Sequence, residues 1–232
     1  MQTSDAAVPT HIGYIVDGNR RWAKKHGIPS YEGHLAGYNT IKDIVKFTTK
    51  QGVKFVSIYV FSTENWRREQ EEVANLMKLS LRVFKTDLKE FIDENLRLRV
   101  LGSREGLSDS LLKAIDEAEK ATAHLTGGTI CICFNYGGWQ EVVDATKAAI
   151  ADGVSPEALT EEAIAQHLYA ADVPPVDMVV RTSGEQRLSN FMLWRTAYSE
   201  LLFLEKFWPE MTTDDVAAII AEYQKRSRRF GG

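Results

Sequence analysis

The stretch His11-Ile-Gly-Tyr-Ile-Val-Asp-Gly-Asn-Arg-Arg-Trp22 decides the fold of this 232-residue chain. Its apolar run, residues 12–16, predicts a buried strand, and Gly18-Asn19 predicts a turn that opens a helix. Ligand sites in parallel α/β sheets lie at the carboxyl ends of strands, where helix N-termini also present free N–H groups. Asp17 and the two arginines after it therefore indicate a place where a metal ion and a phosphate meet. Considered alone, an N-capping aspartate beside a solvated basic turn explains these residues equally well.

Apolar segments typical of strands recur along the chain and alternate with helical patterns. This alternation predicts a single-domain α/β fold with a mainly parallel six-stranded sheet flanked by helices. No Pro/Gly/Ser-rich linker divides the chain, so we assign residues 10–232 to one domain and expect residues 1–9 to be flexible. The expected strands are 12–16, 55–61, 96–101, 129–134, 178–181 and 201–204, and the expected helices are 33–51, 71–94, 108–124, 139–151 with 160–168, 188–198 and 213–226.

The composition narrows the class of partner. A formal net charge of −4 argues against nucleic-acid binding, whereas the clustering of arginines indicates a small, highly charged anionic ligand. Cys131 and Cys133 lie two apart in an apolar run, so we expect buried free thiols and a reducing cytoplasm. We expect neither a signal peptide nor a membrane-spanning segment, and peripheral membrane contact stays open.

Polar side chains gather at the ends of the predicted strands. Because the carboxyl ends of parallel strands meet at one edge of a sheet, these segments predict an active site there. The segments are 17–22, 32–34, 61–68, 135–138 and 181–190, together with Glu200.

Missing motifs narrow the chemistry of this site. No G-x-x-x-x-G-K-[ST] loop, no G-x-G-x-x-G after the first strand and no G-x-S-x-G elbow occurs. An aspartyl-phosphate phosphatase is an alternative, but its general acid would be Asn19, whose amide cannot donate a catalytic proton. The remaining carboxylates, guanidiniums and apolar walls suit Mg²⁺-assisted ionisation of a diphosphate that carries an apolar tail. The apolar stripe of the helix expected at 71–94 fits either core packing or the wall of a long cavity.

Several blocks, in this order and spacing, carry a family resemblance. They are Asp17-Gly-Asn-Arg-Arg-Trp22, Gly33-His34, Phe61-Ser-Thr-Glu-Asn-Trp66, Asn135-Tyr-Gly-Gly138, Arg181-Thr-Ser-Gly-Glu-Gln-Arg187, Ser189-Asn190-Phe191, Trp194 with Tyr198 and Glu200, and Arg228-Arg-Phe-Gly-Gly232. From residue 11 to residue 232 the chain resembles the cis-prenyltransferases, the Z-type isoprenyl diphosphate synthases typified by undecaprenyl diphosphate synthase. The resemblance implies a Mg²⁺-dependent transferase with an apolar substrate tunnel. Such an enzyme condenses isopentenyl diphosphate with an allylic diphosphate, here expected to be farnesyl diphosphate.

The resemblance also implies roles for individual residues. Asp17 and Glu200 match the metal-binding carboxylates. Asp17, Ser62, Asn65 and Arg68 match the group implicated in condensation and proton removal. The allylic-diphosphate site matches Gly18, Asn19, Arg20, Arg21, Trp22 and His34, and the isopentenyl diphosphate site matches Arg181, Arg187 and Ser189. Arg229 and Gly231 match a C-terminal stretch that reaches the partner subunit's diphosphate site, which implies a homodimer.

The chain departs from the family pattern at four positions. Ser30 stands where an arginine usually precedes the Gly-His block, which puts one allylic contact in question. Trp139, Gln186 and Glu69 replace a common arginine, histidine and proline. The retained Asp17 favours a catalytic chain over a noncatalytic subunit.

The expected product is a medium- or long-chain polyprenyl diphosphate, and a short-chain Z-prenyl diphosphate synthase is the alternative. Tyr38, one helical turn after His34, fits either buried packing or a narrowing of the tunnel. Val60, at a position where residue size can limit product length in this family, is of intermediate bulk and leaves the length open.

Overall fold

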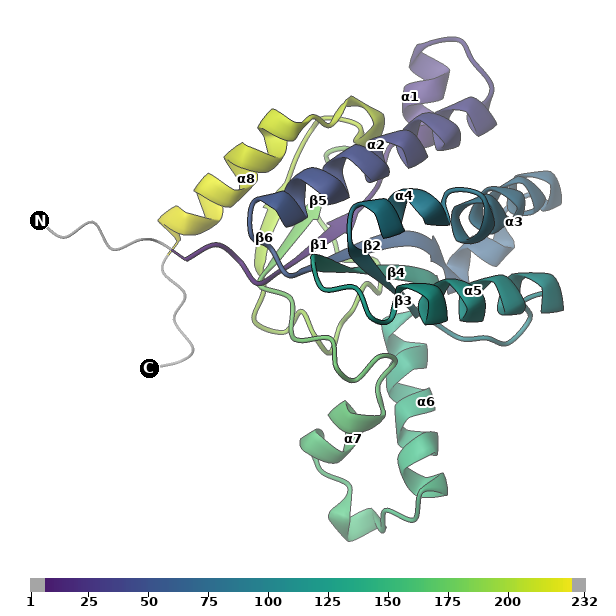
Figure 1. The fold of residues 1–232 in the computed structure, drawn as a ribbon, viewed down its shortest axis with the longest axis vertical. Coiled ribbons are helices and arrows are strands. Elements are labelled where there is room, and N and C mark those ends of the chain that lie inside the picture. The colour runs from purple at the N-terminus through teal and green to yellow at the C-terminus, as the bar shows by residue number, and fades with distance from the viewer. Residues whose placement is uncertain (1–6, 227–232) are drawn as a thin grey trace, which may run out of the picture.

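The centre of the molecule is a six-stranded sheet in which every neighbouring pair of strands is parallel (Figure 1). The computed structural model describes residues 7–226. The strand order is β3-β4-β2-β1-β5-β6, which confirms the predicted parallel α/β fold. The strands are β1 (His11–Ile15), β2 (Phe55–Ser62), β3 (Leu96–Leu101), β4 (Gly128–Tyr136), β5 (Met178–Arg181) and β6 (Glu200–Phe203).

Strand β1 marks the point where the chain reverses its direction across the sheet. It pairs with β2 on one side and with β5 on the other, so the two halves of the sheet diverge from it. In open α/β sheets a crevice forms at such a switch point, outside the carboxyl ends of the strands. Ile15 lies level with Arg181 in the β1–β5 pair, so the residues that follow both strands face this crevice.

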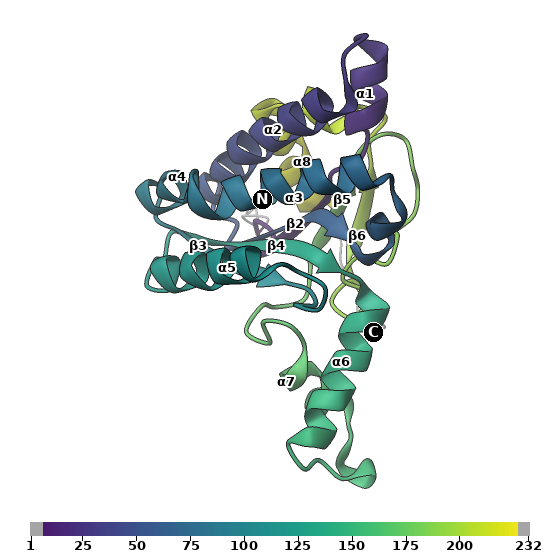
Figure 2. The same cartoon turned by 90° about the vertical axis from the view of Figure 1, so that its right-hand side faces the viewer.

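Helices pack around the sheet. Figure 2 shows α2 and α3 running along one side of the strands, whereas α6 and α7 project away from the body. The helices are α1 (Asn19–Lys25), α2 (Ser30–Lys50), α3 (Gln70–Lys85), α4 (Leu88–Asp93), α5 (Asp109–Thr122), α6 (Gly138–Ala151), α7 (Glu161–His167) and α8 (Thr213–Lys225). Short 3-10 helices span Thr63–Arg67, Pro156–Ala158 and Trp208–Glu210.

Two apolar layers hold the helices and loops to the sheet. Ile12 and Tyr14 of β1 belong to the larger layer, which also contains buried residues of α2, α3, α5 and α8. Ile15 belongs to the smaller layer with Phe191 and Met192. Phe191 packs directly on the β1 backbone, because a Cβ added to Gly13 would lie 2.8 Å from its ring.

Two of the predicted helices are wrong. The helix expected at 71–94 is two helices, because helical structure is interrupted at Thr86 and Asp87, between α3 and α4. Residues 188–198 form turns instead of a helix. Ser189, Asn190 and Met192 have positive φ angles there, which a right-handed helix cannot contain. This turn segment buries Phe191 against the sheet and presents polar side chains to the crevice.

Within residues 7–226, no helix combines the length and the apolar character needed to cross a membrane.

Candidate active site

Asp17 lies at the carboxyl end of the central strand, where backbone contacts hold it. Its N–H donates to Thr182 Oγ1 over 3.1 Å, and its carbonyl accepts from the Thr182 hydroxyl at 2.7 Å and the Trp208 N–H at 3.0 Å. Gly18 then turns the chain with a φ of 105°, and a Cβ there would lie 2.8 Å from the Phe207 ring. The strand end and the glycine turn together direct the Asp17 carboxylate into the crevice.

Arg181 joins Asp17 from the neighbouring strand. Its Nη2 donates to Asp17 Oδ2 over 2.9 Å, and its Nη1 donates to Ser189 Oγ over 2.7 Å and to the Arg187 carbonyl. The side chain is buried, and among the described residues its Nε has no hydrogen-bond partner. A buried guanidinium with an unused N–H is well suited to bind an anion. The structure thus brings Asp17, Arg181 and Ser189 together, as predicted.

Two polar cavities meet at Asp17. We call them the Arg181 cavity and the Arg20 cavity, after an arginine that lines each. Asp17, Asn19, His34 and Arg68 line both, and therefore form a shared wall. The Arg181 cavity also contains Ser62, Asn65, Arg181 and Ser189, and the Arg20 cavity also contains Gly18, Arg20, Arg21 and Ser30.

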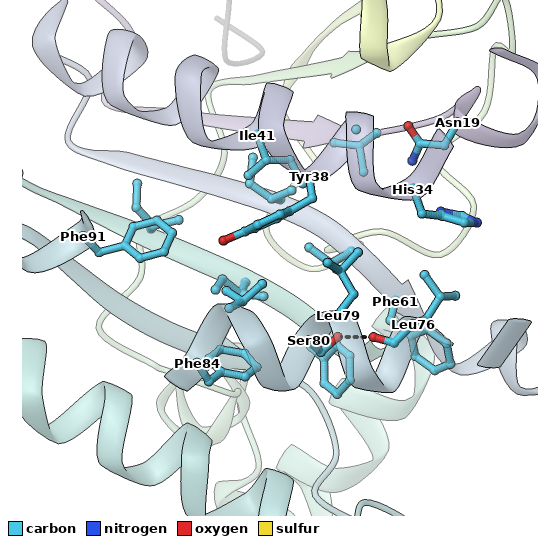
Figure 3. Close-up of a pocket in the computed structure, with 18 residues that line it drawn as sticks. Asn19, His34, Tyr38, Ile41, Phe61, Leu76, Leu79, Ser80, Phe84 and Phe91 are labelled. Carbon is cyan, nitrogen blue, oxygen red and sulfur yellow. Dashed lines mark hydrogen bonds between the residues drawn. The ribbon is translucent and has the colours of Figure 1, made fainter. Parts of the chain in front are cut away.

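An apolar tunnel leaves the shared wall (Figure 3). Asn19 and His34 line its mouth as well as both cavities. Beyond them the tunnel passes between α2 and α3, and Phe91 lies at its far end. Helix α3 contributes Leu76 and Leu79 to the wall. Other apolar residues of α3, among them Val73, Met77 and Leu81, pack against the core, so both interpretations left open by the pattern hold in part.

Glu72, which the sequence analysis did not select, contacts three basic side chains at the tunnel mouth. Its carboxylate lies 2.9 Å from Arg68 Nη1, 3.3 Å from His34 Nε2 and 3.5 Å from Arg20 Nη1. Burial lowers the pKa of His34, and the nearby Glu72 charge opposes that shift. The one signal in the sequence was the i,i+4 spacing from Arg68 to Glu72. Glu72 thus holds in place basic side chains that line both cavities.

Three strand-end segments are tied together beside the Arg181 cavity. The Ser62 N–H donates to Asn65 Oδ1 over 3.1 Å, which caps the 3-10 helix that follows β2. Asn190 donates to Glu64 Oε1 over 3.0 Å and accepts from the Trp139 N–H at 2.9 Å. Asn190 belongs to the predicted polar segment 181–190, although the sequence analysis gave it no individual role.

Other predicted site residues lie outside both cavities. The Trp22 ring packs against His26, with centroids 4.3 Å apart. Arg187 forms an ion pair with Glu185, and the Arg187 side chain is solvent-exposed. Neither Trp22 nor Arg187 lines the Arg181 cavity or the Arg20 cavity, and their roles in substrate binding stay predictions.

Glu200 lies apart from Asp17 in the chain's own fold. It starts β6 and lies level with Met178, whereas Asp17 follows the end of β1 that is level with Arg181. Three residues separate these levels, which is roughly 10 Å along a strand. The Glu200 carboxylate is also 3.0 Å from Arg226 Nη1. The remaining predicted residues, Arg229 and Gly231, are outside the described part of the chain.

Asp17 is the carboxylate that the shared wall offers to a metal ion. In residues 7–226, no group of three or more His, Cys, Asp or Glu side chains could hold an ion by itself. Mg²⁺ often binds through one or two carboxylates, with substrate phosphates and water completing its ligands. Asp17 lines both cavities and is partly exposed, so this donor fits Mg²⁺ when a diphosphate supplies further oxygens.

Comparison with known proteins identifies the family. A family model described as "Putative undecaprenyl diphosphate synthase" matches residues 15–231. The chain belongs to this family. An isoprenyl transferase of Thermotoga maritima is 45% identical over 228 residues, which is 97% of each chain. A ditrans,polycis-undecaprenyl-diphosphate synthase of Micrococcus luteus, described as (2E,6E)-farnesyl-diphosphate specific, is 40% identical over 98% of this chain and 93% of its own.

Solved structures agree with this assignment. Lavandulyl diphosphate synthase from Lavandula x intermedia, in complex with dimethylallyl diphosphate, matches with a TM-score of 0.92 and 32% identity over 97% of this chain and 99% of that one. A probable undecaprenyl diphosphate synthase from Campylobacter jejuni matches with a TM-score of 0.83 and 29% identity over 97% and 100% of the two chains. This chain is an undecaprenyl diphosphate synthase-like cis-prenyltransferase, which confirms the resemblance and disfavours the phosphatase alternative.

Proposed function

We propose that this cis-prenyltransferase condenses isopentenyl diphosphate with farnesyl diphosphate in Z geometry and continues to a medium- or long-chain polyprenyl diphosphate. The observation that carries the proposal is the junction at Asp17, where two arginine-lined cavities share a wall that opens into an apolar tunnel. This geometry suits two anionic head groups and one growing apolar tail. Holding both substrates at one wall makes the carbon–carbon step effectively unimolecular.

The allylic diphosphate is assigned to the Arg20 cavity. Arg20 and Arg21 line it, and His34 connects it to the tunnel mouth. In this position the head group contacts guanidiniums while the tail enters the tunnel. Breaking the allylic C–O bond leaves a diphosphate anion, and fixed guanidiniums stabilise that charge without reorganising.

Isopentenyl diphosphate is assigned to the Arg181 cavity. Arg181 and Ser189 supply donors to its head group. The condensed product must lose a proton, and Ser62, Asn65 and Arg68 line this same cavity. These three side chains are therefore suited to positioning the double bond and receiving or relaying the proton.

Asp17 is assigned to hold Mg²⁺ together with diphosphate oxygens. When bound, the ion would supply positive charge that stabilises the departing diphosphate. The hydrogen bond from Arg181 orients one Asp17 oxygen and leaves the other 3.4 Å from Arg21 Nη2. A metal role for Glu200 stays a prediction.

A homodimer is the proposed assembly, because an apolar face lies beside the site. Trp139 and Tyr198 are each 72% exposed, and Val143, one helical turn beyond Trp139 on α6, is 46% exposed. These three side chains line one shallow cavity. A large exposed apolar patch is typical of an interaction surface, and a second copy is the usual partner.

A cytoplasmic location is also proposed. Cys131 and Cys133 are both free and buried, and burial raises the pKa of the Cys131 thiol to about 12. Unpaired thiols of this kind are typical of proteins from a reducing compartment.

The test is a condensation assay. The purified chain is incubated with Mg²⁺, labelled isopentenyl diphosphate and farnesyl diphosphate, and the products are resolved by length, with a chelator as the control. A ladder that ends at a long polyprenyl diphosphate supports the proposal. A single addition favours the short-chain alternative. The Tyr38 ring on the tunnel wall is compatible with that alternative, because it narrows the space for a growing chain. No elongation with farnesyl, geranyl or dimethylallyl diphosphate would overturn both.

A further inference from the structure

Tyr38 lines the tunnel between its mouth and its far end. It lies on α2 one helical turn beyond His34, and its side chain is 5% exposed. Figure 3 shows its ring between His34 at the mouth and Phe91 at the far end. A chain that grows from the mouth must therefore pass this ring before it reaches Phe91.

A hydrogen bond holds the Tyr38 ring in place. The Tyr38 hydroxyl donates to Asp87 Oδ2 over 2.8 Å, and Arg82 Nε donates to the same oxygen over 3.2 Å. Asp87 is only 6% exposed. On the ring itself, Lys42 Nζ lies 5.3 Å from the centroid. Tyr38 is thus held by a buried carboxylate that belongs to the opposite wall of the tunnel.

Asp87 occupies the break that divides α3 from α4. Its N–H bonds to the Arg82 carbonyl, and its side chain turns inward to Tyr38 instead of outward to solvent. A buried carboxylate is costly unless donors surround it, and here Tyr38 and Arg82 are those donors. An apolar core alone has no need of this pair, because phenylalanine or leucine would fill the same space.

We propose that the Tyr38–Asp87 hydrogen bond is the element that limits the length of the prenyl chain this enzyme makes. The inference rests on the proposed condensation and names its length-determining contact. Chain growth up to the ring fills apolar space at no cost to this contact. Growth beyond it requires the ring to swing aside, which breaks the bond and leaves Asp87 buried with Arg82 as its one remaining donor.

Three substitutions separate the hydrogen bond from the bulk of the ring. Tyr38→Ala removes both, Tyr38→Phe keeps the ring but removes the hydroxyl, and Asp87→Ala removes the acceptor without changing a residue that lines the tunnel. Tyr14→Phe is the matched control, because Tyr14 is a buried tyrosine that bonds Thr48 outside the tunnel. Thermal melting of each variant verifies that it is folded.

The readout is the length distribution of the products made from farnesyl diphosphate and labelled isopentenyl diphosphate. We expect Tyr38→Ala to lengthen the most abundant product by at least one isoprene unit, and Tyr38→Phe and Asp87→Ala to lengthen it by less. Tyr14→Phe is expected to keep the distribution of the unmodified chain.

Two results would overturn the inference while leaving the proposed function intact. One is an active Tyr38→Ala enzyme with an unchanged product distribution. The other is a shift in Tyr38→Ala with none in Asp87→Ala or Tyr38→Phe, which would assign length control to ring volume alone. If the unmodified chain makes no product, the proposed function itself fails, and the inference fails with it.

Discussion

The Glu141 carboxylate accepts a 2.6 Å hydrogen bond from Arg195 Nη1 at a point where neither side chain has appreciable solvent contact. This pair joins α6 to the turn segment at 188–198, which carries Ser189 and Asn190. The Tyr136 hydroxyl donates to the other Glu141 oxygen over 2.5 Å. The buried pair therefore supports the wall of the Arg181 cavity from behind, although none of its members lines that cavity.

Breaking this pair should destabilise the enzyme. Arg195→Met leaves the Glu141 charge buried without its main partner, and we expect the free energy of unfolding to fall by about 3–5 kcal/mol. Urea denaturation measures the change. Glu117→Gln, which disrupts the exposed Lys113–Glu117 pair, is the control and should cost less than about 0.5 kcal/mol. Equal effects in the two variants would contradict the role assigned to burial.

Removing the charge of Asp17 should stop condensation but preserve the fold. Asp17→Asn keeps an oxygen that accepts from Arg181 and removes the carboxylate assigned to the metal. We expect the condensation rate to fall at least about a hundredfold, with little change in melting temperature. Asp43→Asn, on the exposed face of α2, should keep the full rate. Retained turnover in Asp17→Asn would refute the assignment.

The substitution Ser30→Arg, which introduces the arginine usual in the family at this position, should strengthen binding of the allylic diphosphate. Ser30 begins α2 and lines the Arg20 cavity, so a guanidinium there faces the proposed diphosphate site. One added charge-assisted hydrogen bond of roughly 1.5 kcal/mol predicts about a tenfold lower KM for farnesyl diphosphate. The KM for isopentenyl diphosphate should not change, and Ser30→Met controls for added bulk. An unaltered allylic KM would mean that Arg20 and its neighbours already compensate.

The stability of the fold should decrease on acidification because of His11. Its Nδ1–H donates to the Pro174 carbonyl over 2.9 Å, so the neutral ring accepts from Ser57 through Nε2 at 2.7 Å. Burial lowers the pKa of His11 from 6.5 to about 4. The unfolded chain therefore binds more protons between these values, so this contribution is complete above pH 6.5 and is lost as the pH falls to 4, by about 3 kcal/mol in total.

The measurement is the free energy of unfolding at several pH values in that interval. His11→Gln lacks the titrating ring, so its stability should fall less steeply with decreasing pH than that of the unmodified chain. Other groups contribute equally to both proteins, and the difference isolates His11. Parallel curves would show that the buried ring does not control this dependence.

The proposed dimer should depend on the apolar face of α6. Val143→Glu places a charge on that face, and we expect the dimer to dissociate at concentrations where the unmodified chain remains associated. Sedimentation velocity gives the molar mass directly. Ile92→Glu is the control, because Ile92 is exposed on α4. A monomeric unmodified chain would exclude the dimer at this face.

The central strand and its carboxylate could be predicted because their signals are local. An apolar run that ends at Asp17 and Gly18 specifies a buried strand followed by a turn, whatever the rest of the chain does. The same holds for the turn after β2 that carries Ser62 and Asn65. Parallel pairing then brings such strand ends to one edge, so the composition of the site followed from the order of the elements.

The break at Asp87 and the turns at 188–198 could not be predicted in this way. Both segments have apolar spacing compatible with a helix, and short-range propensity favours continuing it. At Asp87 the helix is interrupted, and the Asp87 carboxylate accepts a hydrogen bond from Tyr38, which is 49 positions away. At 188–198 the chain forms turns instead of a helix, and the Phe191 ring fills the space above Gly13. In each case a tertiary contact overrides the local preference.

The amino-acid sequence by itself thus determined the sheet, the polar strand ends and the identity of the charged groups, because backbone propensity and side-chain periodicity act over a few residues. Tertiary structure alone decided which charges meet. Sheet register places Arg181 against Asp17 and puts Glu200 at the opposite edge. The close packing of α2 on Asn19 brings Asn19 and His34 together at the tunnel mouth. Such pairings join residues far apart in the chain, so no local pattern encodes them.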